Sequence, residues 1–175
     1  MANANTVAAI YGLTAQTINA TAETALTQTV NGTASNILLS VPANWNIDGK
    51  TFKVRLVGRA TGGTSATLIL KFYLGTVAAG TNIASFTVSS AAIPTPTLGG
   101  SNFSVNTELT YDSTSQQLNG SHGGQIANTL TANALNSQAT AITSVAGLTF
   151  SASATFGAAV ATNTVTVSEF VIEQV

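Results

Sequence analysis

Hydrophobic and polar residues alternate along three stretches of this sequence. In residues 51–59 and 66–74, Phe, Leu, Val or Ile recurs at every second position, and residues 103–112 follow a similar rule. Successive side chains of a β-strand point to opposite faces of its sheet, so a period of two is typical of a strand with one buried face. We expect three half-buried strands, the first two joined as a hairpin through the glycine-rich residues 61–64.

The rest of the chain also has the pattern of β-structure. No segment shows a sustained hydrophobic period of 3.6 with helix caps. Residues 163–174 carry large apolar side chains on both parities, which predicts a β-bulge or burial on both faces and a central position in a sheet. Residues 91–101 contain Pro94 and Pro96 and are expected to form a long connection, because proline cannot donate to a strand ladder. Further strands are expected at residues 23–30, 36–41, 83–88, 124–132 and 146–155.

These elements predict an all-β fold, an antiparallel, jelly-roll-like β-sandwich of about eight strands. A chain of 175 residues is the size of one domain with a sizeable core. We expect residues 21–175 to form that domain and residues 1–20 to form an N-terminal arm that becomes ordered on a neighbouring subunit. The candidate anchors of the arm are Val7, Ile10, Tyr11 and Leu13.

The sequence contains few charged residues, and this determines what kind of surface we expect. Charged residues make up 6% of the chain, against about 25% in typical soluble domains, and the net charge is -1. The surface must therefore consist mainly of Thr, Ser, Asn, Gln and Ala, and charge repulsion gives little protection against self-association. A sequence pI near 5.6 argues against nucleic acid as a partner. The lack of an apolar run of membrane-spanning length and of a signal-peptide pattern predicts no membrane partner and synthesis in the host cytoplasm without individual secretion.

Few residues are available for chemistry, which argues against an enzyme. There is no cysteine, and the single histidine, His122, lies among Gly, Ser and Asn residues and is expected in a solvated loop. A triad of Ser121, His122 and Asp112 is disfavoured because sequence neighbours rarely form one and no G-x-S-x-G motif is present. Residues 44–49 offer three calcium-type oxygen ligands, but a turn with Asx hydrogen bonds is favoured over a metal site. We expect no catalytic residue, no metal and no cofactor.

Two interpretations of the basic residues remain open. All five fall between residues 50 and 71, whereas most acidic residues lie on later predicted strands, which favours ion pairs across an outer sheet face. Alternatively, Lys53, Arg55 and Arg59 form a basic stripe that binds an acidic partner surface or polysaccharide.

Residues 44–56 (NWNIDGKTFKVRL), 68–75 (LILKFYLG) and 165–173 (VTVSEFVIE) resemble small virion proteins of tailed bacteriophages. The resemblance is to capsid decoration or cement proteins, and it implies a homotrimer with a jelly-roll-like fold. It also implies a location on the outer capsid shell, with the major capsid protein and neighbouring copies of the chain as partners. No diagnostic functional residue comes with it.

The main alternative is a carbohydrate- or receptor-binding β-sandwich from a phage tail, fibre or head spike. That function would require Trp45, Tyr73 and Tyr111 to gather in one exposed groove, whereas for Trp45 alone packing at the edge of the core is favoured. An ice-binding surface is disfavoured because no Thr-x-Thr array repeats at a fixed period.

Overall fold

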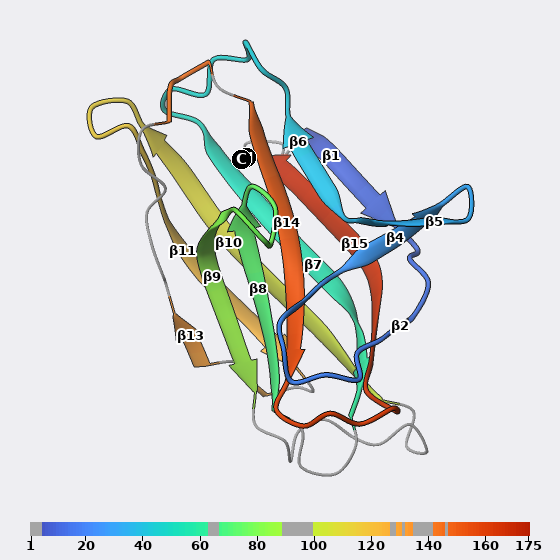
Figure 1. Cartoon of the computed structure of the whole chain (residues 1–175). Coiled ribbons are helices and arrows are strands. Elements are labelled where there is room, and N and C mark those ends of the chain that lie inside the picture. The colour runs from blue at the N-terminus through green and yellow to red at the C-terminus, as the bar shows by residue number, and fades with distance from the viewer. Residues whose placement is uncertain are drawn as a thin grey trace.

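Two antiparallel β-sheets packed face to face form the body of the protein (Figure 1). The computed structural model describes residues 5–62, 67–88, 100–126, 129–130, 132–134, 142–145 and 147–175. These residues form strands and turns, with no helix among them, and all of their strand pairs are antiparallel. The prediction of an all-β antiparallel sandwich is confirmed.

The first sheet contains the longest strands. Its order is β1 (Asn5–Tyr11), β15 (Thr164–Gln174), β7 (Thr51–Thr61), β10 (Ser101–Asp112), β11 (Gln117–Ile126) and β12 (Thr129–Leu130), with β2 (Gln16–Thr17) also paired to β15.

The second sheet lies in front of the first in Figure 1. Its order is β13 (Ala132–Ala134), β9 (Thr81–Val88), β8 (Leu68–Leu74), β14 (Leu148–Phe156) and β3 (Thr24–Ala25), with β6 (Leu38–Val41) also paired to β14.

The core between the sheets is built by the alternation seen in the sequence. On β7, Phe52, Val54 and Leu56 are fully buried, and the residues between them face outward. Aromatic rings then join the two sheets. Phe72 of β8 stacks on Phe170 of β15 with 6.1 Å between ring centroids and meets Phe86 of β9 edge-on at 5.5 Å. These offset and T-shaped geometries are the preferred ones for aromatic pairs.

The predicted hairpin between residues 51–59 and 66–74 is wrong. The two strands exist as β7 and β8, but they lie in different sheets. β7 is hydrogen-bonded on one side to β10 and on the other to β15, so it has no free edge for β8. Alternation identifies the buried face of a strand but not its neighbour. The predicted turn and the proline-containing connection lie largely outside the described residues.

The predicted bulge and central position of the last strand are both confirmed. β15 runs between β1 and β7, and its register against β7 shifts between Val167 and Glu169. The extra residue, Ser168, reverses the parity of the strand. Val165 and Val167 face the core before the bulge, and Phe170 and Ile172 face it afterwards.

The N-terminal segment lies along β15 of its own chain. β1 pairs with the second half of β15, and the backbone N–H groups of Gly12 and Leu13 donate to β15 carbonyl oxygens at 2.9 Å. Of the four predicted anchors, Val7, Ile10 and Leu13 pack against the core of the same chain, whereas Tyr11 is 64% exposed. Ordering of this segment on a neighbouring subunit stays a prediction.

A small hairpin stands apart from both sheets. Among the described strands, β4 (Thr27–Val30) and β5 (Thr33–Asn36) pair only with each other, and they project from the side of the sandwich (Figure 1). Asn31 and Gly32 form its two-residue turn, both with positive φ, as tight hairpins require. The hairpin carries no charged residue, and β5 is exposed along its whole length.

Candidate functional site

A groove of about 420 Å³ crosses the outer face of the first sheet. We call it the outer-face groove. It spans β15, β7, β10 and β11. Its lining residues are Val57, Gly58, Asn102, Phe103, Ser104, Gln125 and Ser168.

The strand register brings these residues together. Val57 of β7 lies opposite Ser104 of β10, and Ser104 lies opposite Gln125 of β11. On its other side, Val57 lies opposite Glu169 of β15, next to the bulged Ser168. Side chains at directly opposed positions stand about 4.5–5.5 Å apart at Cβ, so they form a continuous row across the sheet. Tyr11 of β1 extends the same row, because it lies opposite Glu169.

The floor of the groove depends on a glycine. A Cβ atom added to Gly58 would collide with the carbonyl oxygen of Thr166 and would lie 2.6 Å from the ring of Phe103. Neither neighbour can move freely, since one is strand backbone and the other a core ring. Any side chain at position 58 would therefore disturb both the strand pairing and the floor of the groove.

Two arginines flank the groove on β7. Arg55 Nη2 donates to Glu169 Oε1 at 2.7 Å. Arg59 lies on the opposite flank, directly across from Asn102 of β10 and Thr166 of β15, and it is exposed. All six acidic residues of the chain are within the described part, and none of them forms a salt bridge with Arg59.

Two of the three lysines form salt bridges, the contact that the ion-pair interpretation predicted, and the third lies over an aromatic ring. Lys53 lies opposite Glu108 and forms a salt bridge with it at 3.2 Å. Lys71 forms a salt bridge with Glu23 at 3.0 Å. Lys50 Nζ lies 4.4 Å from the centre of the Trp45 ring, a cation–π distance. The structure thus leaves Arg59 as the one member of the predicted basic stripe that has no acidic partner.

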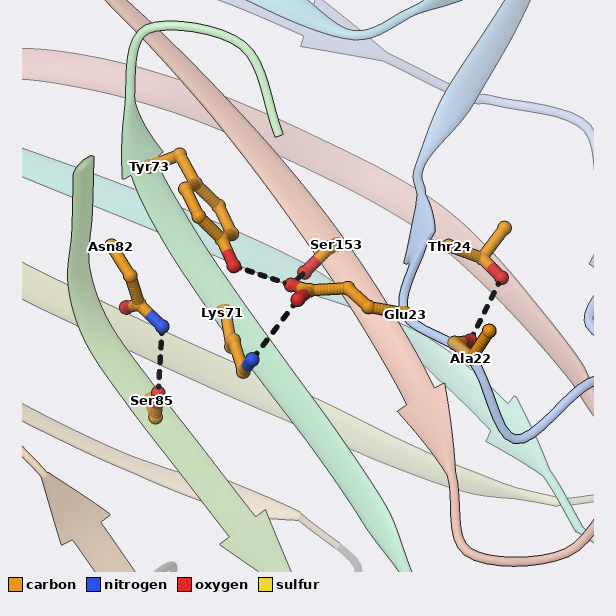
Figure 2. Close-up of polar contacts among 8 residues, drawn as sticks. All are labelled: Ala22, Glu23, Thr24, Lys71, Tyr73, Asn82, Ser85 and Ser153. Atoms are coloured by element: carbon orange, nitrogen blue, oxygen red, sulfur yellow. Dashed lines mark hydrogen bonds and ion pairs between the residues drawn. The ribbon is translucent and has the colours of Figure 1, made fainter. Parts of the chain in front are cut away.

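A second polar cluster lies on the outer face of the second sheet (Figure 2). We call it the Glu23 cluster. Glu23 precedes β3, and its carboxylate reaches over β14 and β8. Oε1 accepts hydrogen bonds from Ser153 Oγ and, at 2.6 Å, from Tyr73 Oη, and Oε2 accepts one from Lys71 Nζ at 3.0 Å. Ser153 and Tyr73 are buried, so the cluster holds the chain segment before β3 on the sheet and offers no exposed nucleophile.

The pKa of Glu23 lies below its ordinary value. Burial acts to raise it, but the hydrogen bonds from Ser153, Tyr73 and Lys71, together with the charge of Lys71, lower it by more. The pKa of Tyr73 is raised, first by burial and then by its hydrogen bond to Glu23 and the charge of that carboxylate. Glu23 is therefore ionised and Tyr73 neutral at neutral pH, as their hydrogen bond requires.

The expectation of a solvated loop around His122 is wrong. His122 is on β11 opposite Thr107, a core-facing residue, and its ring meets that of Phe86 edge-on at 5.8 Å. Burial lowers the pKa of His122, which favours the neutral ring. The neighbouring glycines misled the sequence interpretation. At Gly124, a Cβ would crowd the backbone of β10, so this glycine serves close strand pairing and not loop flexibility.

The strand geometry also separates the residues of the hypothetical triad. Ser121 and His122 are consecutive on β11 and so point to opposite faces. Asp112 lies at the far end of β10, where it accepts hydrogen bonds from the Thr114 N–H at 2.9 Å and the Ser115 hydroxyl at 2.6 Å. These contacts form an Asx-type turn.

The three aromatic residues required by the carbohydrate-binding alternative do not gather in one groove. Trp45 is half-buried and packs edge-on against Phe52 at 6.3 Å, as its favoured interpretation predicted. Tyr111 is buried in the core and donates to the carbonyl oxygen of Ile142 at 2.6 Å. Tyr73 belongs to the Glu23 cluster on the other sheet. The structure instead places one exposed aromatic residue, Tyr11, in the row that crosses the outer-face groove.

The calcium-type loop folds as the favoured Asx turn, with Asn46 Oδ1 accepting from the Asp48 N–H at 3.0 Å. Within the described ranges, no group of three or more His, Asp or Glu side chains is placed to hold a metal ion. The same ranges contain no helix with the length and hydropathy needed to cross a membrane.

No protein-family model matches this chain, and no curated protein matches it by sequence. Among solved structures, it is similar to the CBM2 module of the evolved Dit of Lactobacillus casei BL23 phage J-1. That similarity has 13% identity, covers 94% of this chain and 88% of the other, and has a TM-score of 0.39. The chain is also similar to the carbohydrate recognition domain of Emp46p in its potassium-bound form, with 10% identity, 77% and 76% coverage and a TM-score of 0.36. Likeness at this level does not extend to the position or chemistry of a binding site.

Proposed function

We propose that this chain is a non-enzymatic binding module that holds a carbohydrate in the outer-face groove. The observation that carries the proposal is the lining of the groove. Asn102 and Gln125 supply amide donors and acceptors, and Ser104 and Ser168 supply hydroxyls, around the apolar Val57. Sugars combine hydroxyl groups with apolar ring faces, so a few polar groups around an apolar floor match them.

The size of the groove supports the same ligand class. Its volume of about 420 Å³ falls within the range of about 300–1,000 Å³ that is typical of small-molecule sites. Tyr11 lies two strands from Val57, or about 10 Å at the usual strand spacing. An oligosaccharide that fills the groove can therefore extend across β15 and stack on the exposed Tyr11 ring.

Binding without catalysis fits the residues present. All seven lining residues are uncharged and have no titratable side chain. The carboxylate of Glu169, which follows the lining residue Ser168 in the chain, forms a salt bridge with Arg55. Acid–base chemistry needs a titratable group within reach of the substrate, and the residues that line the groove supply none.

Filling the groove tests the proposal. Ser104→Trp places a large ring in the centre of the row, and Ser104 is exposed, so the fold should tolerate it. Thr110→Trp is the matched control, on the same strand and face but about 20 Å away. On a glycan array, the wild type and Thr110→Trp should retain the same glycans, whereas Ser104→Trp should bind them at least tenfold more weakly. The absence of any bound glycan, or full binding by Ser104→Trp, would contradict the proposal.

A second candidate function, a capsid decoration or cement protein, is favoured by the β4–β5 hairpin. An isolated two-stranded hairpin is marginally stable in water, and unpaired strand edges without charge readily add a further strand. No other described strand pairs with the edges of this hairpin, which has no charged residue and a Val30 side chain that is 52% exposed. In this function, the chain would be a homotrimer on the outer capsid shell that contacts the major capsid protein and its own neighbouring copies.

The second candidate predicts attachment to particles through the hairpin. Purified protein should be a trimer by light scattering and should saturate capsid shells at a fixed ratio in sedimentation. Val30→Lys with Ala34→Lys should reduce that attachment at least tenfold, because charge on both hairpin strands opposes strand addition. Thr81→Lys, at an exposed position of β9, is the control. A monomer that does not sediment with shells would rule this function out.

A further inference from the structure

We infer that the ligand of the outer-face groove is an acidic carbohydrate and that Arg59 holds its anionic group. This inference rests on the proposed function and specifies its ligand class. It follows from three observations: the charge balance of the outer face, the position of Arg59 and the orientation that the neighbouring ion pair imposes.

One basic side chain has no acidic or aromatic partner among the described residues. The chain has five basic residues. Lys53, Arg55 and Lys71 each form a salt bridge, and Lys50 lies over the Trp45 ring. Arg59 has no such partner among the described residues, which include every acidic residue of the chain. In a chain with so few charges, this one stands out, because its field is not cancelled by a neighbour.

The position of Arg59 puts this charge at the edge of the groove. Arg59 is two residues from Val57 on β7 and shares its outward parity. It lies directly opposite Asn102, a lining residue, so the two Cβ atoms are about 4.5–5.5 Å apart. An arginine side chain is long enough to cover that distance and place its guanidinium over the groove.

The other flank of the groove gives the ligand an orientation. Arg55 is neutralised by Glu169, and this carboxylate lies in the same row as Val57. An anionic group near that flank would meet a carboxylate, whereas near Arg59 it meets an unpaired guanidinium. The acidic group of the ligand is therefore expected at the Arg59 end, with neutral sugar rings toward β15 and Tyr11.

The guanidinium suits a carboxylate or a sulfate ester. Its planar fork donates two parallel hydrogen bonds to two oxygens of one anionic group, which a lysine ammonium cannot reproduce. Hydrogen bonds to charged groups are among the stronger ones in proteins. Because Arg59 is exposed, ions in solution screen it, and the interaction should weaken as salt is added.

Oligosaccharide pairs that differ only in charge test this inference. The probes are oligogalacturonate with its methyl ester, sialyllactose with lactose, and a sulfated galactan oligomer with its desulfated form, measured by calorimetry against the full chain. For at least one pair, the acidic member should bind about tenfold or more tightly than the neutral member, and the difference should shrink as NaCl is raised. Which pair shows the preference distinguishes a carboxylate from a sulfate.

Three variants test whether Arg59 causes the preference for the acidic member of a pair. Arg59→Gln should bind both members of the pair equally, and Arg59→Lys should retain only part of the preference because the fork is lost. Lys50→Gln removes the same charge about 30 Å away, at the residue that precedes β7, and should leave the preference intact. Equal binding of acidic and neutral probes by the wild type, or an undiminished preference in Arg59→Gln, would overturn the inference while leaving the carbohydrate-binding proposal standing. If the chain binds none of these probes and no glycan on the array, the inference and the carbohydrate-binding proposal both fail.

Discussion

Replacing Phe72 by alanine is expected to lower the free energy of unfolding by about 3–5 kcal/mol, the range found for buried aromatic residues. Phe72 is 1% exposed and contacts both Phe86 in its own sheet and Phe170 in the opposite sheet. Its removal therefore leaves a cavity between the sheets and breaks two ring contacts at once. Domains of this size are stable by about 5–15 kcal/mol, so the variant should lose a large share of its stability.

Urea unfolding followed by Trp45 fluorescence and far-UV circular dichroism measures this loss. Tyr11→Ala is the control, because Tyr11 is an aromatic residue of the same protein that is 64% exposed. This control substitution should change the free energy of unfolding by no more than about 0.5 kcal/mol, as for most surface substitutions. If Phe72→Ala unfolds at the same urea concentration as the wild type, the aromatic contact between the sheets does not stabilise the sandwich.

The faces of the strands could be predicted from the sequence, but their neighbours could not. Alternation correctly assigned the buried face of β7 and β10, and the double-sided pattern of β15 correctly predicted a bulge and a central position. The pairing of β7 with β8 failed, since a side-chain pattern carries no information about which distant strand supplies the next hydrogen bonds. Pairing depends on long-range contacts that only the complete fold establishes.

The outer-face groove could not be predicted for the same reason. Val57, Ser104 and Gln125 lie far apart in the sequence and meet only through the register of three strands. Ser168 joins them because it is the bulged residue of β15. The one sequence feature that pointed toward this region was the concentration of basic residues between positions 50 and 71. Cross-strand pairing uses Lys53 and Arg55 and leaves Arg59 unmatched.

His122 and Glu23 show how composition can mislead. Glycines around His122 suggested a loop, yet the residue is inside a ten-residue strand and faces a phenylalanine of the other sheet. Glu23 was expected inside a continuous strand over residues 23–30, whereas the chain is divided there into β3 and β4. Its carboxylate is oriented by hydroxyl and ammonium donors from β8 and β14, which no local pattern can reveal.

Replacing Glu23 by alanine is expected to lower the free energy of unfolding by about 3 kcal/mol at pH 7, because it leaves buried donors without an acceptor. The hydroxyls of Ser153 and Tyr73 are both in buried residues, and both donate to the same carboxylate oxygen. The partly exposed Lys71 can turn toward water and should contribute little to the loss. Glu23→Gln keeps an oxygen acceptor for the two hydroxyls and should cost only about 1 kcal/mol.

The pH dependence of these variants separates the charge of Glu23 from its packing. The pKa of Glu23 in the folded protein is below its ordinary value of 4.5. Such a carboxylate stabilises the fold fully above about pH 4.5, and this contribution is lost as the pH falls through the folded-state pKa. The difference in stability between the wild type and Glu23→Gln should therefore be constant from about pH 5.5 to 7 and should narrow below about pH 4.5. Urea unfolding at each pH measures it. If the stability difference between the wild type and Glu23→Gln does not change with pH, the ionised carboxylate does not hold the segment before β3 on the second sheet. If Glu23→Ala is as stable as the wild type at pH 7, the hydrogen bonds from the two hydroxyls do not hold that segment either.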